Sequence, residues 1–309
     1  MIDYEEFRKR LSNIFERLRN AITERKDIRQ QSYISKEVIS VCVPAAANLF
    51  TDKSWFKFWN KYNQRVLDLL NQKEDVNRSF YFIDYVFAFA NDNLTEDEGK
   101  HIYKLFSAFN NTIDKSLELI NQNQDLANKF KRKIEGKIIE TITDGPKAAD
   151  ETENSAFKNH LNEIAFFYQI ASHPKIGIVE IEKVMPNGKK ADFHLVCDDT
   201  EYFVDTITIH NTEEREDINW FVEGKIEEKI KDKKINELQD EYIKSRFRVL
   251  PIIEFENRLI DFTPNLPTDK CFQPMISLLE EQNGEAYISL FHLPLNGDIK
   301  EQLKDNNSL

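Results

Sequence analysis

Two aspartates occupy neighbouring apolar segments within residues 187–210, and their spacing favours metal chemistry. Asp192 lies near the start of one predicted strand, and Asp205 lies inside the next one. A polar turn at residues 198–200 separates them, so the strands are expected to run antiparallel and to bring both carboxylates to one edge of a sheet. Because adjacent carboxylates repel, such a pair is rarely kept without a cation or a shared proton. The spacing therefore predicts a site for a hard divalent cation, Mg²⁺ or Mn²⁺.

Neighbouring side chains could extend this site. Alternate residues of a strand share a face, so His194 is expected to point the same way as Asp192, and Ile207 the same way as Asp205. Glu163 lies in the preceding predicted helix and could hold a metal-bound water or a second ion. Such an ion would stabilise charge on a scissile phosphate and lower the pKa of an attacking water. In the alternative interpretation these acids are solvated strand-end residues, and His194 is packed locally.

The segment from residue 155 onward mixes helical and strand patterns. Pro186-Asn187-Gly188 is a turn sequence that favours a hairpin. Three strands in succession, then a crossover helix and a further strand, predict a mixed sheet in an α/β layer. The expected helices span about 157–172, 221–245 and 273–282, and the expected strands span about 176–184, 191–197, 202–209, 248–255 and 286–293.

The order of these elements and acids resembles the PD-(D/E)XK nuclease superfamily in the C-terminal half of the chain. Residues 191–192 take the place of its Pro-Asp pair, residues 205–207 take the place of its (D/E)XK tripeptide, and Glu163 is similar to the acid of its first core helix. The resemblance implies a restriction-endonuclease-like αβββαβ core with Asp192, Asp205 and Glu163 as metal ligands. It also implies magnesium-dependent endonuclease activity on DNA, in a prokaryotic defence or restriction setting.

The lysine of this motif is missing from its usual place, because the chain has Ile207 there. In the superfamily that lysine is expected to orient or activate the water and to counter developing charge. Lys225 or Lys229, one turn apart in the following helix, could reach back to the sheet edge and replace it. A bulge that brings Thr206 or Thr208 into the place is a second alternative. The third is a catalytically inactive module that binds nucleic acid or a partner protein.

The first half of the chain has a different pattern. Residues 1–143 show helical periodicity, and the polar stretch around Gly145-Pro146 breaks it. The aromatic run at 55–62 could stack bases but is more typical of a core. We therefore predict an all-helical domain at 1–145, a linker at 146–154 and the nuclease-like domain at 155–309.

Within the helical half, two further features are informative. Thr95 and Glu98 have the spacing of a capping box. Residues 129–133, with the sequence KFKRK, form the densest basic cluster of the chain. Such a cluster could contact a nucleic-acid backbone, but a single cluster of this kind is usually only part of the solvated surface. The expected helices span about 7–18, 33–49, 54–72, 77–91, 96–122 and 124–142.

Composition and charge limit the class of protein. Residues 1–150 carry 24 basic and 23 acidic side chains, whereas residues 151–309 carry 18 basic and 31 acidic ones. Because an acidic surface attracts nucleic acid poorly, the helical half is expected to supply the contacts to DNA, the partner favoured over RNA. The helical half could also bind a second copy of the chain or a partner protein. Three scattered cysteines, no secretory signal and no long apolar run predict a cytoplasmic protein without a membrane segment.

Overall fold

The computed structural model describes residues 3–24, 26–71, 82, 86, 95–143, 156–209, 218–254, 269–282 and 285–292. Within these residues the chain combines helices with one six-stranded mixed sheet, so the protein is of the α+β class. The linker expected at 146–154, most of the helix expected at 77–91, and His210 lie outside the described residues.

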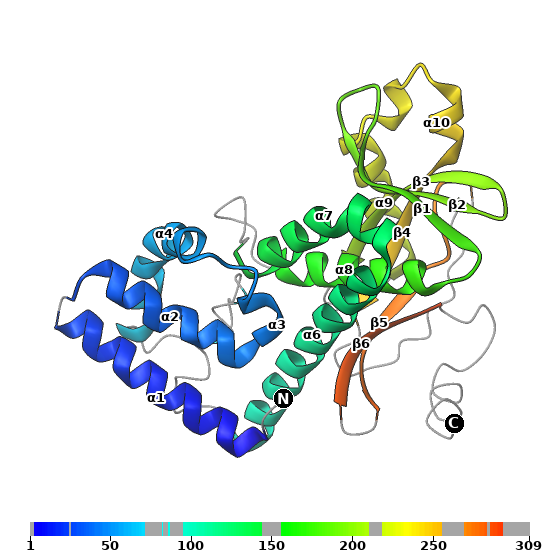
Figure 1. Cartoon of the computed structure of the whole chain (residues 1–309). Coiled ribbons are helices and arrows are strands. Elements are labelled where there is room, and N and C mark those ends of the chain that lie inside the picture. Colours follow the sequence, from blue (N-terminus) through cyan, green and yellow to red (C-terminus); the bar gives the residue numbers. More distant parts are fainter. Residues whose placement is uncertain are drawn as a thin grey trace. The chain divides into compact units, whose positions relative to one another are not determined.

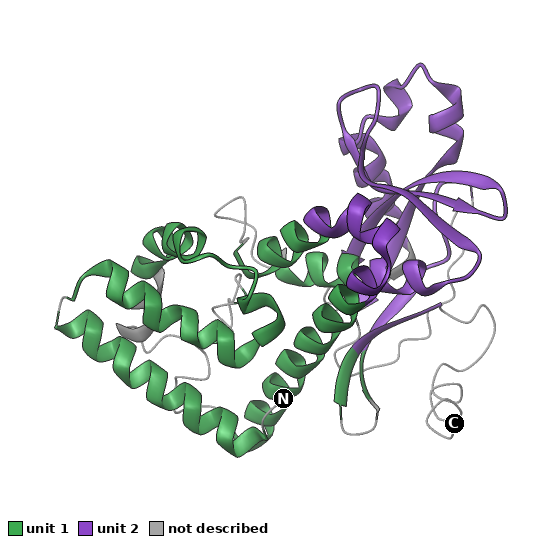
Figure 2. Ribbon diagram, viewed as in Figure 1, with its two compact units in different colours: residues 1–118, 134–164, 279–287 green, residues 119–133, 165–278, 288–309 purple. Residues whose placement is uncertain are grey.

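The chain forms two compact units, which Figure 2 shows in different colours. Unit 1 comprises residues 1–118, 134–164 and 279–287, and unit 2 comprises residues 119–133, 165–278 and 288–309. Three helices contribute residues to both units, so the chain does not divide at a single point. These helices are α6 (Glu96–Gln122), α7 (Gln124–Thr143) and α8 (Ala156–Ser172).

Unit 1 is built mainly from helices (Figure 1). Its first two helices are amphipathic and have capped starts. Asp3 and Asp27 accept hydrogen bonds from the first turns of the first two helices. Thr95 N donates to Glu98 Oε2 at 2.7 Å, and Glu98 N donates to Thr95 Oγ1 at 3.3 Å, which confirms the predicted capping box at the start of α6. The N-terminal helices are α1 (Tyr4–Thr23), α2 (Ile28–Cys42), α3 (Pro44–Ala47) and α4 (Asp52–Asn71).

Aromatic side chains fill the centre of unit 1. Trp55 and Trp59 of α4 are buried, so most of the aromatic run at 55–62 belongs to the core, as the sequence predicts. The indole Nε1 of Trp55 donates to the carbonyl oxygen of Ser32 at 3.1 Å and to Oγ of Ser35 at 2.9 Å. These bonds satisfy the buried indole and join α4 to α2.

Asn110 of α6 gives a test of packing within unit 1. Its Oδ1 accepts the backbone N–H of Ala45 at 2.9 Å, at the start of α3, and the side chain is buried. Asn110→Ala would leave that N–H without its partner, so we expect the free energy of unfolding to fall by about 1 kcal/mol. Urea denaturation measures this loss. Asn128→Ala, on the exposed side of α7, is the control and should change stability by less than about 0.5 kcal/mol.

The six strands lie side by side in sequence order. The first three strands form an antiparallel meander, and the fourth is parallel to the third, which confirms the predicted crossover connection. The fifth strand is parallel to the fourth. The strands are β1 (Ile176–Val184), β2 (Lys190–Cys197), β3 (Thr200–Ile209), β4 (Phe247–Glu254), β5 (Met275–Gln282) and β6 (Glu285–His292).

The helix predicted at 273–282 is wrong, because these residues form β5. Met275, Ile276 and Ser277 are all buried in succession. A strand that is covered on both faces loses the alternation of polar and apolar residues, and a short apolar run of this kind resembles a buried helix in pattern. The sequence pattern therefore predicted a helix where the chain forms a strand.

Both predicted turns of the meander are confirmed. Gly188 has a φ of 77°, and its N–H donates to the carbonyl oxygen of Met185 at 2.9 Å in the β1–β2 turn. Asp198 and Asp199 have φ values of 45° and 63° in the β2–β3 turn. Positive φ at both central residues matches the twist of an antiparallel hairpin, and aspartate tolerates this region better than most residues.

The long helix predicted at about 221–245 is broken into three pieces. Lys234 has a left-handed φ of 53°, which a helix interior does not accommodate. Val222 and Ile226 pack into a buried cluster with Val249 and Ile253 of β4, so the first piece lies against the sheet. The pieces are α9 (Ile218–Asp232), the 3₁₀ turn η2 (Ile235–Glu237) and α10 (Glu241–Arg246).

Candidate active site at a fork in the sheet

Strands β2 and β3 part in the middle of the sheet. They pair from their turn as far as Phe193 and Val204. Beyond that pair, β2 continues along β1 and β3 continues along β4. Asp192 and Asp205 are the first residues past the last β2–β3 pair. The structure therefore brings these two predicted site residues together where two strands of unit 2 diverge.

The two carboxylates take over the hydrogen bonds that the parted strands no longer make with each other. The backbone N–H of Asp192 donates to Oδ1 of Asp205 at 2.9 Å. The backbone N–H of Thr206 donates to Oδ2 of Asp192 at 2.9 Å, and the Thr206 hydroxyl lies 3.2 Å from the same oxygen. Each carboxylate thus uses one oxygen to accept hydrogen bonds from the opposite strand, and its second oxygen does not take part in these bonds.

The second oxygens of both carboxylates meet an amine from the end of α9. Nζ of Lys233 lies 2.6 Å from Oδ2 of Asp205 and 3.9 Å from Oδ1 of Asp192. The 2.6 Å contact is a close ion pair with a fully buried carboxylate. Nζ of Lys229 lies 3.5 Å from the same oxygen. Two carboxylates and two ammonium groups therefore form one compact ionic cluster.

Lys233 was not among the residues that the sequence singled out. It lies four residues after Lys229, so both side chains leave the same side of a helical segment and reach the same carboxylate. The four-residue spacing from Lys229 is the feature of the sequence from which Lys233 could have been predicted as a second amine at the site. The backbone of Lys233 is also fixed, because Nδ2 of Asn187 in the β1–β2 turn donates to its carbonyl oxygen at 2.8 Å.

Lys225, the other lysine that the sequence singles out, and Ile207 lie outside this ionic cluster. Lys225 is exposed and its Nζ pairs with Glu228 at 2.8 Å, so it is not brought to the aspartates. Ile207 packs against the hydrophobic cluster between α9 and the sheet. Of the two lysines that the sequence singles out, Lys229 therefore reaches the aspartates and Lys225 does not.

Burial and the neighbouring carboxylate of Asp192 raise the pKa of Asp205 above the ordinary value, while Lys229 and Lys233 act to lower it. The folded chain therefore binds this proton more tightly than the unfolded chain, and ionisation of Asp205 costs folding free energy. The cost is absent well below the ordinary aspartate pKa, grows as pH rises from that value to the raised one, and stays constant above it.

We therefore expect Asp205→Asn to gain stability relative to the unchanged chain as pH rises from about 3 to about 7. Urea unfolding of both proteins at a series of pH values measures the difference. A stability difference that stays constant with pH would show that Asp205 titrates as in the unfolded chain.

Two other predicted participants have partners of their own. Glu163 belongs to unit 1, where its carboxylate pairs with Nζ of Lys137 and both side chains are largely buried. His194 stacks on Phe203, with ring centroids 4.5 Å apart, and its Nε2 lies 3.1 Å from Oε2 of Glu201. The local packing of His194 agrees with the structural rather than the ligand interpretation.

The basic cluster at residues 129–133 makes contacts within the protein. Nζ of Lys129 pairs with Asp125 at 2.8 Å. Lys133 donates to a backbone carbonyl of β1, and its Nζ lies 3.9 Å from Glu180. These lysines therefore support α7 and its contact with β1 within unit 2, which weakens the interpretation of the cluster as a phosphate-binding surface.

The donor set at the fork fits a magnesium ion in part. Oδ1 of Asp192 and Oδ2 of Asp205 are carboxylate oxygens that face one common positive charge, the Lys233 ammonium. Mg²⁺ prefers such oxygens and commonly binds through one or two carboxylates while keeping several waters. Among the described residues no group of three acidic, histidine or cysteine side chains gathers as a metal site. The protein would thus supply two oxygens there.

Comparisons of the chain with protein-family models, with curated proteins and with solved structures found no match. In the described part of the chain, no helix has the length and apolarity needed to cross a membrane. The chemistry of the fork is therefore the basis for a functional proposal.

Proposed function

We propose that the protein is a magnesium-dependent DNA endonuclease whose hydrolytic site is the fork between β2 and β3. The observation that carries this proposal is the ionic cluster itself. Asp192 and Asp205 each direct one oxygen toward the same point, and Lys229 and Lys233 bring two positive charges to it. Carboxylates for a metal ion beside amines for a phosphate are the groups that phosphodiester hydrolysis needs.

The order of the elements supports the resemblance to PD-(D/E)XK nucleases. Helix α8, strands β1 to β3, helix α9 and strand β4 occur in the αβββαβ order that the resemblance implies, with η2 and α10 inserted between α9 and β4. In this proposal Asp192 and Asp205 take the places of the two motif acids. The setting in prokaryotic defence or restriction, and the cytoplasm as location, rest on the resemblance and the composition.

Each residue at the fork has a role in the proposal. Asp192 and Asp205 would hold the ion, because each has one oxygen directed toward Lys233 rather than toward the opposite strand. A bound Mg²⁺ would supply charge for the scissile phosphate and a more acidic water. Lys233, closer to the carboxylates than Lys229, takes the part of the motif lysine and neutralises charge that develops on the phosphate. Lys229, whose ammonium lies 3.5 Å from the buried carboxylate of Asp205, lowers the pKa of that carboxyl and so opposes the effect of burial. The support expected from Glu163 stays a prediction.

Metal-dependent cleavage tests the proposal directly. The purified full chain is incubated with single-stranded and duplex DNA in Mg²⁺, Mn²⁺ or EDTA, and we expect cleavage only with a metal ion. Because an ion that binds only the folded state must raise the melting temperature, either metal should also raise Tm. The proposal fails if no DNA is cut under any metal and Tm does not respond.

A second function is favoured by the same cluster. The Lys233 ammonium already neutralises the two oxygens that would bind a metal ion, which is also what a catalytically inactive nuclease-like module would show. Such a module would bind nucleic acid or a partner protein without cutting. It predicts DNA binding that is unchanged by EDTA, and no rise of Tm with Mg²⁺.

A further inference from the structure

A small pocket lies between α2 and α4 of unit 1. Its volume is about 230 Å³, less than that of a typical drug-sized site and suited to a fragment such as one nucleobase. Its lining supplies two aromatic rings, two cations, two hydroxyls and one acid. The lining residues are Arg29, Ser32, Tyr33, Asp52, Lys53 and Phe56.

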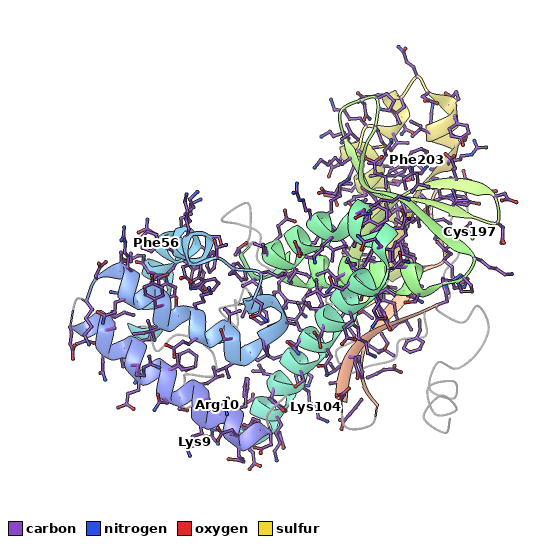
Figure 3. The ribbon with its side chains drawn as sticks, in the orientation of Figure 1. Lys9, Arg10, Phe56, Lys104, Cys197 and Phe203 are labelled. Carbon is purple, nitrogen blue, oxygen red and sulfur yellow. The ribbon has the colours of Figure 1, made fainter. Side chains whose placement is uncertain are left out.

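The aromatic rings of this pocket differ from the buried core of the same helices. Tyr33 is 57% exposed, whereas Trp55 and Trp59 are buried. Phe56 lies on α4 (Figure 3), is half-buried, and has the guanidinium carbon of Arg29 5.8 Å from its ring centroid. Tyr33 and Phe56 line the same pocket and provide aromatic surface for a flat ligand.

The charge of the pocket favours an anion. Arg29 and Lys53 are both exposed. The acid of the pocket, Asp52, is paired with Lys36 at 2.8 Å, so its negative charge is neutralised by a side chain outside the lining set. The pocket therefore presents two cations beside two aromatic rings.

We propose that this pocket binds one unpaired nucleotide of a single-stranded nucleic acid, with the base on Tyr33 and Phe56 and the phosphates on Arg29 and Lys53. Stacking on aromatic rings requires an exposed base face, and bases within a duplex do not offer one. This inference rests on the proposed nuclease function. It specifies the substrate of that nuclease as single-stranded nucleic acid.

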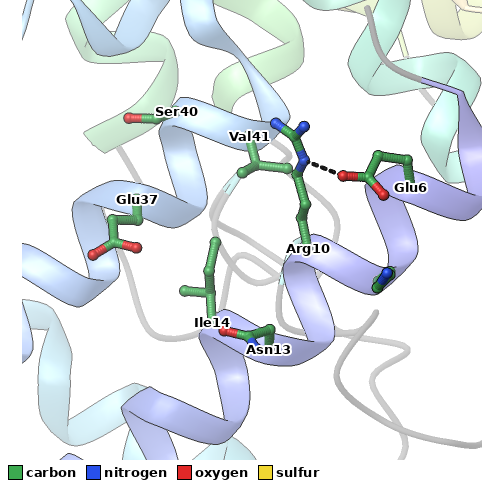
Figure 4. A pocket seen from close by; sticks show the side chains of 8 residues that line it. Glu6, Arg10, Asn13, Ile14, Glu37, Ser40 and Val41 are labelled. Atoms are coloured by element: carbon green, nitrogen blue, oxygen red, sulfur yellow. Dashed lines mark hydrogen bonds and ion pairs between the residues drawn. The ribbon is translucent and has the colours of Figure 1, made fainter.

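A second hollow in unit 1 provides a matched control. It lies between α1 and α2, has a volume of about 480 Å³, and is lined by Lys9 and Arg10 among other residues (Figure 4). It carries cations but no aromatic side chain, and Arg10 is paired with Glu6 at 2.7 Å. Loss of a cation here should not affect a ligand that needs stacking.

Binding is measured by fluorescence anisotropy with a labelled oligothymidylate of about ten nucleotides, in EDTA so that nothing is cut. Tyr33→Ala should weaken binding by about tenfold, and Tyr33→Phe should restore it, because stacking on one ring contributes about 1–3 kcal/mol, a tenfold change corresponding to about 1.4 kcal/mol. Lys53→Gln should weaken binding and lower the salt dependence by about 0.7 in slope. Lys9→Gln should bind as the unchanged chain does. Circular dichroism establishes that each variant is folded, as expected for exposed positions.

Several results would overturn the inference. One is that the unchanged chain binds a duplex of the same sequence as tightly as the single strand. Another is that neither Tyr33→Ala nor Lys53→Gln changes the affinity. A third is that Lys9→Gln weakens binding as much as Lys53→Gln does. The nuclease proposal fails separately. If Tyr33→Ala weakens binding but no metal supports cleavage, the pocket is supported without the hydrolytic site. If DNA is cut but Tyr33→Ala binds normally, the hydrolytic site is supported without the pocket.

Discussion

Asp205→Asn is expected to lower the rate of DNA cleavage by at least about a thousandfold while the chain stays folded. Asparagine has nearly the same shape and can still accept the N–H of Asp192 through its side-chain oxygen, so the strand-to-strand contact at the fork survives. The substitution removes the negative charge that would hold a metal ion. Since that ion contributes several kcal/mol to transition-state stabilisation, its loss corresponds to three or more decades in rate.

The measurement is the initial rate of cleavage at saturating Mg²⁺, together with Tm in EDTA and in Mg²⁺. The control is Glu228→Gln, because Glu228 is an exposed acid of α9 whose partner is Lys225 and not the cluster. We expect its rate and its metal-dependent Tm to match those of the unchanged chain. Cleavage by Asp205→Asn within about tenfold of the unchanged chain would place the metal elsewhere.

Lys233→Met is expected to produce two effects of opposite sign. The rate at saturating metal should fall by about a hundredfold or more, because one stabiliser of developing phosphate charge is lost. The Mg²⁺ concentration needed for half-maximal activity should fall as well. The Lys233 ammonium lies against the two oxygens that would hold the ion, so its removal leaves them to the metal.

Titration of the cleavage rate with Mg²⁺ separates the two effects, and the rise of Tm with Mg²⁺ reports the metal affinity independently of activity. Lys229→Met should lower the rate less, because its amine is farther from Asp205 and more exposed. Lys225→Met is the matched control on the same helix and should behave as the unchanged chain. If only Lys225→Met lost activity, the assignment of the amines at the fork would be wrong.

The elements around the site were largely predictable from the sequence. Strand β1 alternates in burial over its first half, and the turns between β1, β2 and β3 contain residues with strong turn preferences, such as Gly188 and Asp198. The failures came from elements whose pattern is set by tertiary surroundings. β5 has three buried residues in succession and so lost its alternation. Helix α9 ends at Asp232, two residues before the left-handed Lys234, and nothing in the local sequence requires a left-handed residue there.

The geometry of the site was less predictable than its acids. Spacing indicated that Asp192 and Asp205 could meet, since each lies at the corresponding level of adjacent strands. It did not indicate that the strands part there, because the fork depends on which neighbour each strand keeps on its other edge. It also did not place Glu163, whose partner Lys137 lies in another helix. Contacts of this kind depend on packing across the whole unit, which periodicity does not encode.

Because Asn187 binds the backbone of Lys233, the position of the Lys233 amine depends on the length of the β1–β2 turn, which is far away in the sequence. The carbonyl of Lys233 is held from the β1–β2 turn, while its ammonium is held from the fork. Inserting a residue into that turn, or shortening it, would therefore shift the amine without altering any acid. Among relatives of this chain, the length of the β1–β2 turn and the position of the lysine should change together.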